Sequence, residues 1–327
     1  MKQFLRLFFT GFSMGTADIV PGVSGGTIAF ILGIYEELIY SIKVMSGECL
    51  RLLFVERDLV AAVKKVPFSF LIPLGLGILT AVVTLASLLE SLLLHYPTLI
   101  WSFFLGLIAA SIYIVRKRVV TWDMHDYVAL VITAIVAYVL VGLVPVETSS
   151  HPLMILASGA IAICAMILPG ISGSFLLLIM GKYEQILGAV ADRDIMTLGI
   201  FMIGAALGIS LFSRVLSWLF AKHHDITVAA LIGFMIGSLR KVWPWKEVVS
   251  TRIDSHGEVV PLIEKNILPN IQDSTFWLAL LLVTVGFGVM LLLNKLQVTA
   301  EQTKDVTDTS FEKAHTASVT SQKKHKV

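Results

Sequence analysis

Two copies of a short motif interrupt apolar stretches of the chain: PGVSGG at residues 21–26 and PGISGS at residues 169–174. Proline lacks a backbone N–H and glycine adopts unusual dihedral angles, so each motif should end one helix and let another begin. Inside hydrocarbon, such a break is tolerated only where protein or a water-filled cavity satisfies the freed backbone groups. Two matched breaks at membrane depth therefore indicate a binding site.

The chemistry that these breaks favour is anion binding. A helix that restarts in a membrane presents free N–H groups and a dipole end worth roughly half a positive charge. Phosphate and carboxylate groups bind such ends, and transporters with inverted repeats use them near the bilayer midplane. The alternative is that the motifs only cap and kink buried helices. We expect substrate contacts from Asp18, Pro21, Gly22, Ser24, Gly25, Gly26, Thr27, Pro169, Gly170, Ser172, Gly173 and Ser174.

Charged residues are rare in the apolar segments, so each one is informative. Arg214, within LFSRVLSWLF, is the candidate side-chain cation for a phosphate, although it could also pair with a carboxylate or extend to the membrane surface. Asp18 has Met166 as its counterpart near the second motif, which excludes a symmetric pair of catalytic carboxylates. Asp18 could accept a proton, pair with Arg214 or cap the break.

Two glutamates recur at equivalent places after the two motifs. Glu36 follows Tyr35 and Glu184 follows Tyr183. We interpret the tyrosines as anchors at the membrane interface. The glutamates are candidates for gating or for coupling transport to a proton or Na⁺.

The sequence offers little for enzymatic chemistry. Histidines lack metal-ligand spacing, and there is no nucleotide-binding loop or nucleophile motif. Cys49 and Cys164 are the two cysteines, so no disulfide framework is expected. We predict no catalytic residues, no metal, no cofactor and no nucleic-acid partner.

Composition indicates an integral membrane protein. The chain has 327 residues, of which 56% are hydrophobic and 15% charged, whereas soluble domains carry about 25% charged residues. Mean hydropathy is +0.85. The first 22 residues lack the apolar core and cleavage site of a signal peptide, so we expect them in the mature protein.

The expected elements fall into two similar halves. In the first half, residues 1–145, two arms surround the break (4–20 and 25–40), an amphipathic surface helix follows (41–67), and three apolar segments complete it (68–94, 99–115 and 127–144). The second half, 146–296, has arms at 152–168 and 173–187 and apolar segments at 197–220, 227–239 and 275–293. Residues 240–274 form a polar connection, and residues 297–327 a tail expected to be disordered and cytoplasmic.

The two halves are predicted to be a duplication. At an offset of 148, residues 17–39 match the second copy at ten of 23 positions without a gap. The offset then falls to 127, where Gly77 meets Gly204 and Gly106 meets Gly233. The second half has lost the surface helix. The alternative is two unrelated helices that share turn chemistry.

An odd number of crossings per half would invert the second half relative to the first. Re-entrant hairpins give three crossings and fully spanning arms give five, and the sequence leaves these two open. With the N-terminus inside, 17 Lys and Arg residues face the cytoplasm and seven face outside. We therefore expect both termini to be cytoplasmic.

The stretch ADIVPGVSGGTIAFILGIYE and its copy LPGISGSFLLLIMGKYE resemble the domain-of-unknown-function 368 family of bacterial and archaeal membrane proteins. The resemblance covers residues 10–293, and the first motif is the specific one, because Ser174 replaces its second glycine in the copy. It implies a polyprenyl-phosphate transporter of the PopT group. Such proteins return undecaprenyl phosphate across the cytoplasmic membrane during envelope recycling.

We therefore predict an all-α, multi-pass protein of the cytoplasmic membrane, with two inverted repeats that each hold a broken hairpin and three transmembrane helices. Its function would be lipid-phosphate transport, with the prenyl tail left in the lipid bilayer and the halves rocking around the headgroup. One rival is a transporter or channel for a small anion, which would lack a lateral opening to lipid. The other is a membrane-embedded phosphatase or lipid transferase, which is not favoured because no acid, base and nucleophile set can be assembled.

Overall fold

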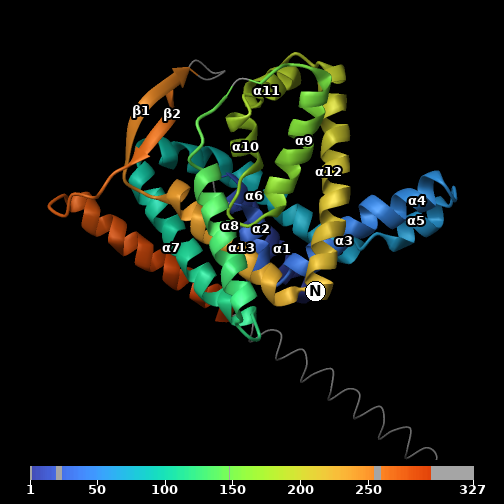
Figure 1. Cartoon of the computed structure of the whole chain (residues 1–327), viewed down its shortest axis with the longest axis horizontal. Coiled ribbons are helices and arrows are strands. Elements are labelled where there is room, and N and C mark those ends of the chain that lie inside the picture. The colour runs from blue at the N-terminus through green and yellow to red at the C-terminus, as the bar shows by residue number, and fades with distance from the viewer. Residues whose placement is uncertain (1, 20–23, 147, 254–258, 296–327) are drawn as a thin grey trace, which may run out of the picture.

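The computed structural model describes residues 2–19, 24–146, 148–253 and 259–295, and these are mostly helical (Figure 1). The predictions for Pro21, Gly22 and the tail lie outside the described residues. By length and composition, four helices could cross a membrane: α6 (Phe68–His95), α7 (Pro97–Val115) with the 3-10 turn η2 (Arg116–Arg118), α12 (Ile195–Lys222) and the Ser274–Lys295 helix. The prediction of a mainly helical, multi-pass membrane protein is confirmed at this level.

Four other long helices do not meet this length and composition, because they are shorter or carry charged ends. They are α1 (Lys2–Ile19), α8 (Met124–Leu140), α9 (Pro152–Ile167) and α13 (His224–Val242). α6 and α12, with 28 residues each, are about 42 Å long at 1.5 Å per residue, which exceeds a hydrocarbon core of about 30 Å.

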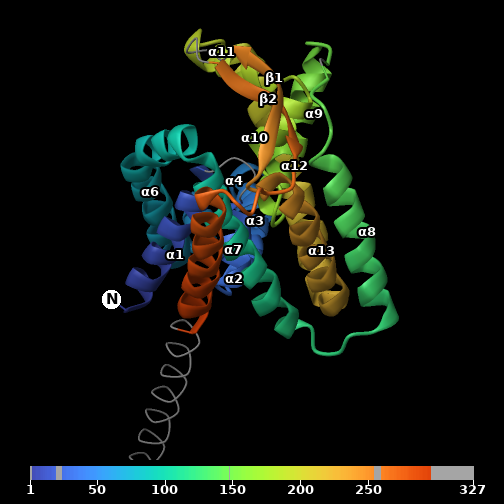
Figure 2. The same ribbon diagram turned by 90° about the vertical axis from the view of Figure 1, so that its left-hand side faces the viewer.

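The long helices are arranged in pairs (Figure 2). α1 packs along α6, α9 along α12, α8 along α13, and α7 along the Ser274–Lys295 helix. Glycines allow the closest approaches: Gly77 of α6 faces the Phe8 carbonyl, and Gly204 of α12 faces the Leu156 carbonyl. The glycines are 127 residues apart and their partners 148, the two offsets of the sequence repeat. The same contact therefore recurs in both pairs.

The arm after each break is divided again, contrary to the prediction of continuous arms at 25–40 and 173–187. The first becomes α2 (Gly25–Ile31) and α3 (Tyr35–Val44), and the second becomes α10 (Gly173–Ile179) and α11 (Tyr183–Ala191). The dividing residues are Gly33 (φ 73°) and Gly181 (φ 63°), which adopt a left-handed conformation that favours glycine. Each seven-residue helix is about 10 Å long and cannot cross a bilayer.

The segment predicted as one surface helix, 41–67, consists of several pieces. α3 runs into a π-helical turn, η1 (Met45–Cys49), followed by α4 (Leu50–Phe54) and α5 (Leu59–Lys65). Asp58 caps α5 by accepting a hydrogen bond from the Ala61 N–H, and a Lys65–Glu48 ion pair of 2.7 Å joins α5 to η1. α4 and α5 project away from the helix pairs (Figure 1).

The polar connection contains a β-hairpin that the sequence did not predict. β1 (Lys246–Ile253) pairs antiparallel with β2 (Val259–Asn266), and the register shifts around Ser250. Both views place the hairpin on the side of the molecule where α10 and α11 lie (Figures 1 and 2). Within the described residues, this hairpin is the departure from an all-α fold.

The centre of the fold is α2. All seven of its residues are buried, and it contacts α1, α3, α7 and α9. Its Phe30 packs edge-on against Tyr35, which packs against Phe220 of α12. The structure thus encloses the start of α2 in protein, as the cost of unpaired backbone groups in hydrocarbon requires.

The glycine contacts of α6 allow a stability test. A methyl group at Gly77 would overlap the Phe8 carbonyl of α1, whereas a methyl group at Gly75 meets open space. We expect Gly77→Ala to lower the free energy of unfolding by about 1–3 kcal/mol through overpacking. Gly75→Ala, the matched control, should be neutral or slightly stabilising. Denaturant unfolding in detergent measures both, and equal effects would contradict the close pairing of α1 with α6.

Candidate functional site

The start of α2, which follows the first break, is capped by hydrogen bonds within the protein. α1 ends at Ile19, and Ser24 stands before α2 with an extended backbone. The Ser24 hydroxyl accepts a hydrogen bond from the Gly26 N–H at 3.1 Å, which makes it the predicted N-cap. The buried N-terminus of α2 is therefore capped from inside the fold.

The Asp18 carboxylate binds an N–H group at the start of α2 that we expected to be free. The Gly25 N–H donates to the Asp18 carboxylate at 2.6 Å. A Cβ at position 25 would overlap that carboxylate, so glycine is required there. Of the three interpretations for Asp18, the observed contact is the local cap. The carboxylate stands where an external anion would sit, and the equivalent Met166 cannot do this.

The structure brings the two breaks together. The Ser24 hydroxyl donates to the Met166 carbonyl at 3.2 Å, and the Gly170 N–H donates to the Thr27 hydroxyl at 2.9 Å. The Tyr35 hydroxyl donates to the Ile167 carbonyl at 3.0 Å. Backbone groups freed by the second break thus find partners on α2 and at the start of α3. The expected convergence of the two motifs is observed for these residues.

The second break is more open than the first. Pro169, Gly170 (φ 88°) and Gly173 are buried, but Ser174 is exposed. The Ser172 hydroxyl is hydrogen-bonded at 2.8 Å to the Ser174 hydroxyl and makes no capping bond to α10. Two neighbouring hydroxyls are therefore accessible at the start of α10, where the first break presents a buried cap.

An apolar cavity of about 450 Å³ lies beside the second break. Three of its lining residues, Leu168, Ile171 and Leu176, flank Ser172 and Ser174 in the chain. The other walls come from α8, α9, α12 and α13, through Val136, Leu140, Ala160, Ile161, Cys164, Ala165, Gly208, Leu211, Phe212, Val215 and Phe234. The two hydroxyls therefore belong to residues that stand between cavity-lining residues in the chain, an arrangement suited to an amphiphile with a polar head.

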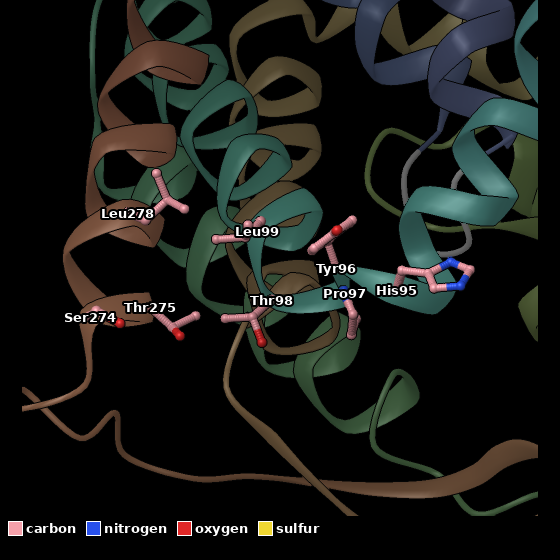
Figure 3. Close-up of a pocket in the computed structure, with 8 residues that line it drawn as sticks. All are labelled: His95, Tyr96, Pro97, Thr98, Leu99, Ser274, Thr275 and Leu278. Carbon is pink, nitrogen blue, oxygen red and sulfur yellow. The ribbon is translucent and has the colours of Figure 1, made fainter.

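A second pocket, of about 430 Å³, is far more polar and involves none of the predicted site residues. It lies where α6 ends and where α7 and the Ser274–Lys295 helix begin (Figure 3). Its lining residues are His95, Tyr96, Pro97, Thr98, Leu99, Ser274, Thr275 and Leu278.

The structure does not show a contact between Arg214 and either break in the described residues. Arg214 is exposed on α12, and its guanidinium approaches Gly47 of η1. Its role in substrate binding therefore stays a prediction.

The two repeated glutamates have different surroundings. Glu36 lies 3.6 Å from Nε2 of His224, whose Nδ1 is 3.0 Å from the Asp225 carboxylate. Glu184 is exposed on α11. The contact of Glu36 with His224, which also contacts Asp225, was not predicted, because His224 is far from Glu36 in sequence.

Two residues were misjudged from sequence. Tyr35, predicted as an interfacial anchor, is fully buried, because Phe30 and Phe220 surround its ring. Lys182, counted as an external loop residue, is 1% exposed, and its ammonium donates to the Thr148 carbonyl and to Gln185. Lys182 replaces Ile34 in the repeat, which is the one signal in the sequence that its place is internal.

Comparison with known proteins finds a family model and two relatives whose descriptions agree. A family model described as VCA0040-like, undecaprenyl phosphate translocase-like, matches residues 14–260. A polyprenyl-phosphate transporter of Vibrio cholerae is 42% identical over 299 residues, which cover 90% of this chain and 97% of that protein. A polyprenyl-phosphate transporter of Staphylococcus aureus is 35% identical over 265 residues, or 75% and 88% of the two chains. No solved structure matches.

The link between the breaks can be tested at Tyr35. Tyr35→Phe keeps the ring but removes the donor to the Ile167 carbonyl, so we expect a loss of about 1 kcal/mol in the free energy of unfolding. Tyr40→Phe, five residues further along α3 and 60% exposed, is the control and should have no effect. Chemical denaturation of the two variants provides the comparison. A Tyr35→Phe variant as stable as wild type would show that this bond does not hold the breaks together.

Proposed function

The chain belongs to the undecaprenyl phosphate translocase-like family, and we propose that it transports polyprenyl phosphate across the cytoplasmic membrane and so recycles the carrier lipid of envelope synthesis. Two relatives that align over most of their length are polyprenyl-phosphate transporters. We propose a transport role without catalysis.

The observation that carries the proposal is the pairing of accessible hydroxyls with an apolar cavity at the second break. Ser172 and Ser174 offer hydrogen bonds to phosphate oxygens, and Leu168, Ile171 and Leu176 line the space next to them. A polyprenyl phosphate combines one phosphate with a long hydrocarbon chain. It therefore matches both parts of the site, with the headgroup at the hydroxyls and the start of the chain in the cavity.

The same observation disfavours transport of a small soluble anion. Such an ion gains nothing from a hydrocarbon-lined space of about 450 Å³, since apolar surface stabilises apolar ligands. A phosphatase or lipid transferase would need a nucleophile or base at the breaks, yet the Asp18 carboxylate is engaged by the Gly25 N–H.

We propose that the two halves are inverted repeats that rock around the breaks. The support is the recurrence of equivalent helix pairs: α1 with α6 corresponds to α9 with α12, and α7 with the Ser274–Lys295 helix corresponds to α13 with α8. Residues 1–145 and 146–296 would be the two repeats, and the short helices α2 and α10 would form re-entrant elements. Both termini would be cytoplasmic, in line with the distribution of Lys and Arg.

Within this proposal the site residues have unequal roles. Asp18, Ser24, Gly25, Gly26 and Thr27 would hold the first break closed, together with Pro21 and Gly22 of the same motif. Pro169, Gly170 and Gly173 would shape the second break, and Ser172 and Ser174 would contact phosphate. Arg214 would supply a cation from α12 in another stage of transport.

Coupling to a proton or Na⁺ would act through the repeated glutamates. Glu36 and His224 join α3, which follows the first break, to the start of α13. A proton shared between them would change the attraction between these elements as the halves move. Glu184 would play the equivalent part in the second half.

Transport of labelled polyprenyl phosphate in proteoliposomes tests the proposal. We expect Ser172→Ala combined with Ser174→Ala to lower flux at least tenfold, because each hydroxyl bond to a charged phosphate is worth about 1.5–3 kcal/mol. Ser24→Ala with Ser172→Ala, and Arg214→Ala, should also lose transport while still inserting. Ser150→Ala, on an exposed loop, is the control. A complete absence of flux by wild type would refute the proposed function. Coupling is tested separately, by measuring flux under imposed pH or Na⁺ gradients.

A bulky residue in the cavity separates the lipid substrate from a small anion. Cys164→Trp on α9 should fill part of the cavity and block flux of polyprenyl phosphate. Met154→Trp, on an exposed position of the same helix outside the cavity, is the matched control and should transport normally. Undiminished lipid flux through the Cys164→Trp variant would show that the prenyl chain does not use this cavity.

A further inference from the structure

Three charged side chains meet at the base of the hairpin, outside the breaks. The ammonium groups of Lys241, at the end of α13, and Lys246, at the start of β1, each lie 3.2 Å from the same oxygen of Glu264 on β2. The three side chains are 23%, 7% and 22% exposed. Two cations therefore share one carboxylate in a largely enclosed place and keep a net charge of +1.

Aromatic rings wall this cluster. The Lys246 ammonium lies 4.3 Å from the ring centre of Trp101 on α7, and the Lys241 ammonium 5.0 Å from that of Phe175 on α10. An ammonium group has three N–H donors, and an aromatic face is only a weak acceptor. Among the described residues, the hydrogen bonds of both groups go to Glu264. Donors are therefore available for a second anion.

The lowered pKa of Lys246 agrees with a shortage of negatively charged partners. Burial lowers the pKa of Lys246 to about 8, although the Glu264 carboxylate acts in the opposite direction. Lys241 adds repulsion. One carboxylate thus does not compensate for the burial of this cation beside a second one, and another negative charge would stabilise the cluster.

The position of Phe175 connects the cluster to the second break. Phe175 is the third residue of α10 and follows Ser174 directly, so Lys241 lies close to the start of that helix. Lys241 therefore lies between the hairpin and the start of α10, where Ser172 and Ser174 carry their hydroxyls.

We propose that Lys241 and Lys246 form a phosphate-monoester site that receives the headgroup before it reaches Ser172 and Ser174. The inference rests on the proposed function, which it extends by a second, more peripheral contact for the same substrate. Glu264 holds the two ammonium groups in place while the site is empty and competes with the incoming phosphate. The ligand chemistry is that of a phosphate monoester, whether on a prenyl lipid or as free phosphate.

Binding to the purified full-length protein in phosphatidylcholine nanodiscs tests the site. Calorimetric titration with farnesyl phosphate should give a Kd about tenfold higher for Lys241→Gln and for Lys246→Gln, because each loses a charge-assisted hydrogen bond. Lys246→Arg should retain most of the affinity. Lys265→Gln, next to Glu264 on β2 and exposed, is the matched control and should bind like wild type.

The Glu264→Gln variant separates an anion site from a purely structural ion cluster. Removal of the competing carboxylate should tighten farnesyl phosphate binding about tenfold, even if the variant is less stable. A structural cluster predicts lower thermal stability for every variant without tighter binding by Glu264→Gln, and that outcome would overturn the inference. Unchanged affinity across all variants would overturn it as well.

Two further arms identify the source of the phosphate and the protonation state. Inorganic phosphate that competes with farnesyl phosphate at similar concentration would mark free phosphate as the ligand, and weak competition would mark the lipid. Wild-type affinity should fall as pH rises above about 8, because Lys246 then loses its proton. The groups that face Lys246 are Glu264, Lys241 and Trp101. Lys246→Gln should lack this fall.

The outcomes for this site and for the proposed function are distinct. Wild-type flux in proteoliposomes together with a flat binding series would leave transport intact and remove the lysine site. The predicted binding series without any wild-type flux would keep a phosphate-monoester site and remove the transport function.

Discussion

The structure depends on the need to satisfy backbone groups wherever a helix is broken inside an apolar fold. Breaks after α1 and α9 free N–H and carbonyl groups that lipid cannot hydrogen-bond. The fold meets this need by joining the breaks: Gly170 donates to Thr27, Ser24 to the Met166 carbonyl and Tyr35 to the Ile167 carbonyl. These bonds join residues 132 to 143 apart in the chain, so they hold the two motifs in one region and leave little freedom in how the halves meet there.

The same bonds make the two breaks unequal. The first break supplies its own carboxylate and its own cap, and all of α2 is buried. The second supplies carbonyls and an N–H to the first, and its Ser172 and Ser174 hydroxyls bond to each other near residues that line the apolar cavity. The two similar motifs thus differ in their surroundings, and the difference involves side chains such as Asp18 and Met166.

Sequence reasoning predicted the features that depend on local chemistry. Proline and glycine located both breaks, Ser24 was recognised as a cap, and apolar runs located the long helices within a few residues. It missed the second division of each arm, although Gly33 and Gly181 were matched in the repeat, because glycine in apolar helices is common. It could not find the burial of Tyr35, the Glu36–His224 contact or the Lys246 cluster, since these join residues far apart in the chain.

The carboxylate at Gly25 has a consequence for stoichiometry. Two equivalent helix starts would bind two anions at the centre of the protein, and their mutual repulsion would grow with the charge of each. Because the Asp18 carboxylate accepts the Gly25 N–H, one of the two helix starts is already filled from within the chain. With the headgroup at the other start, as proposed, a transport cycle would move a single lipid at a time.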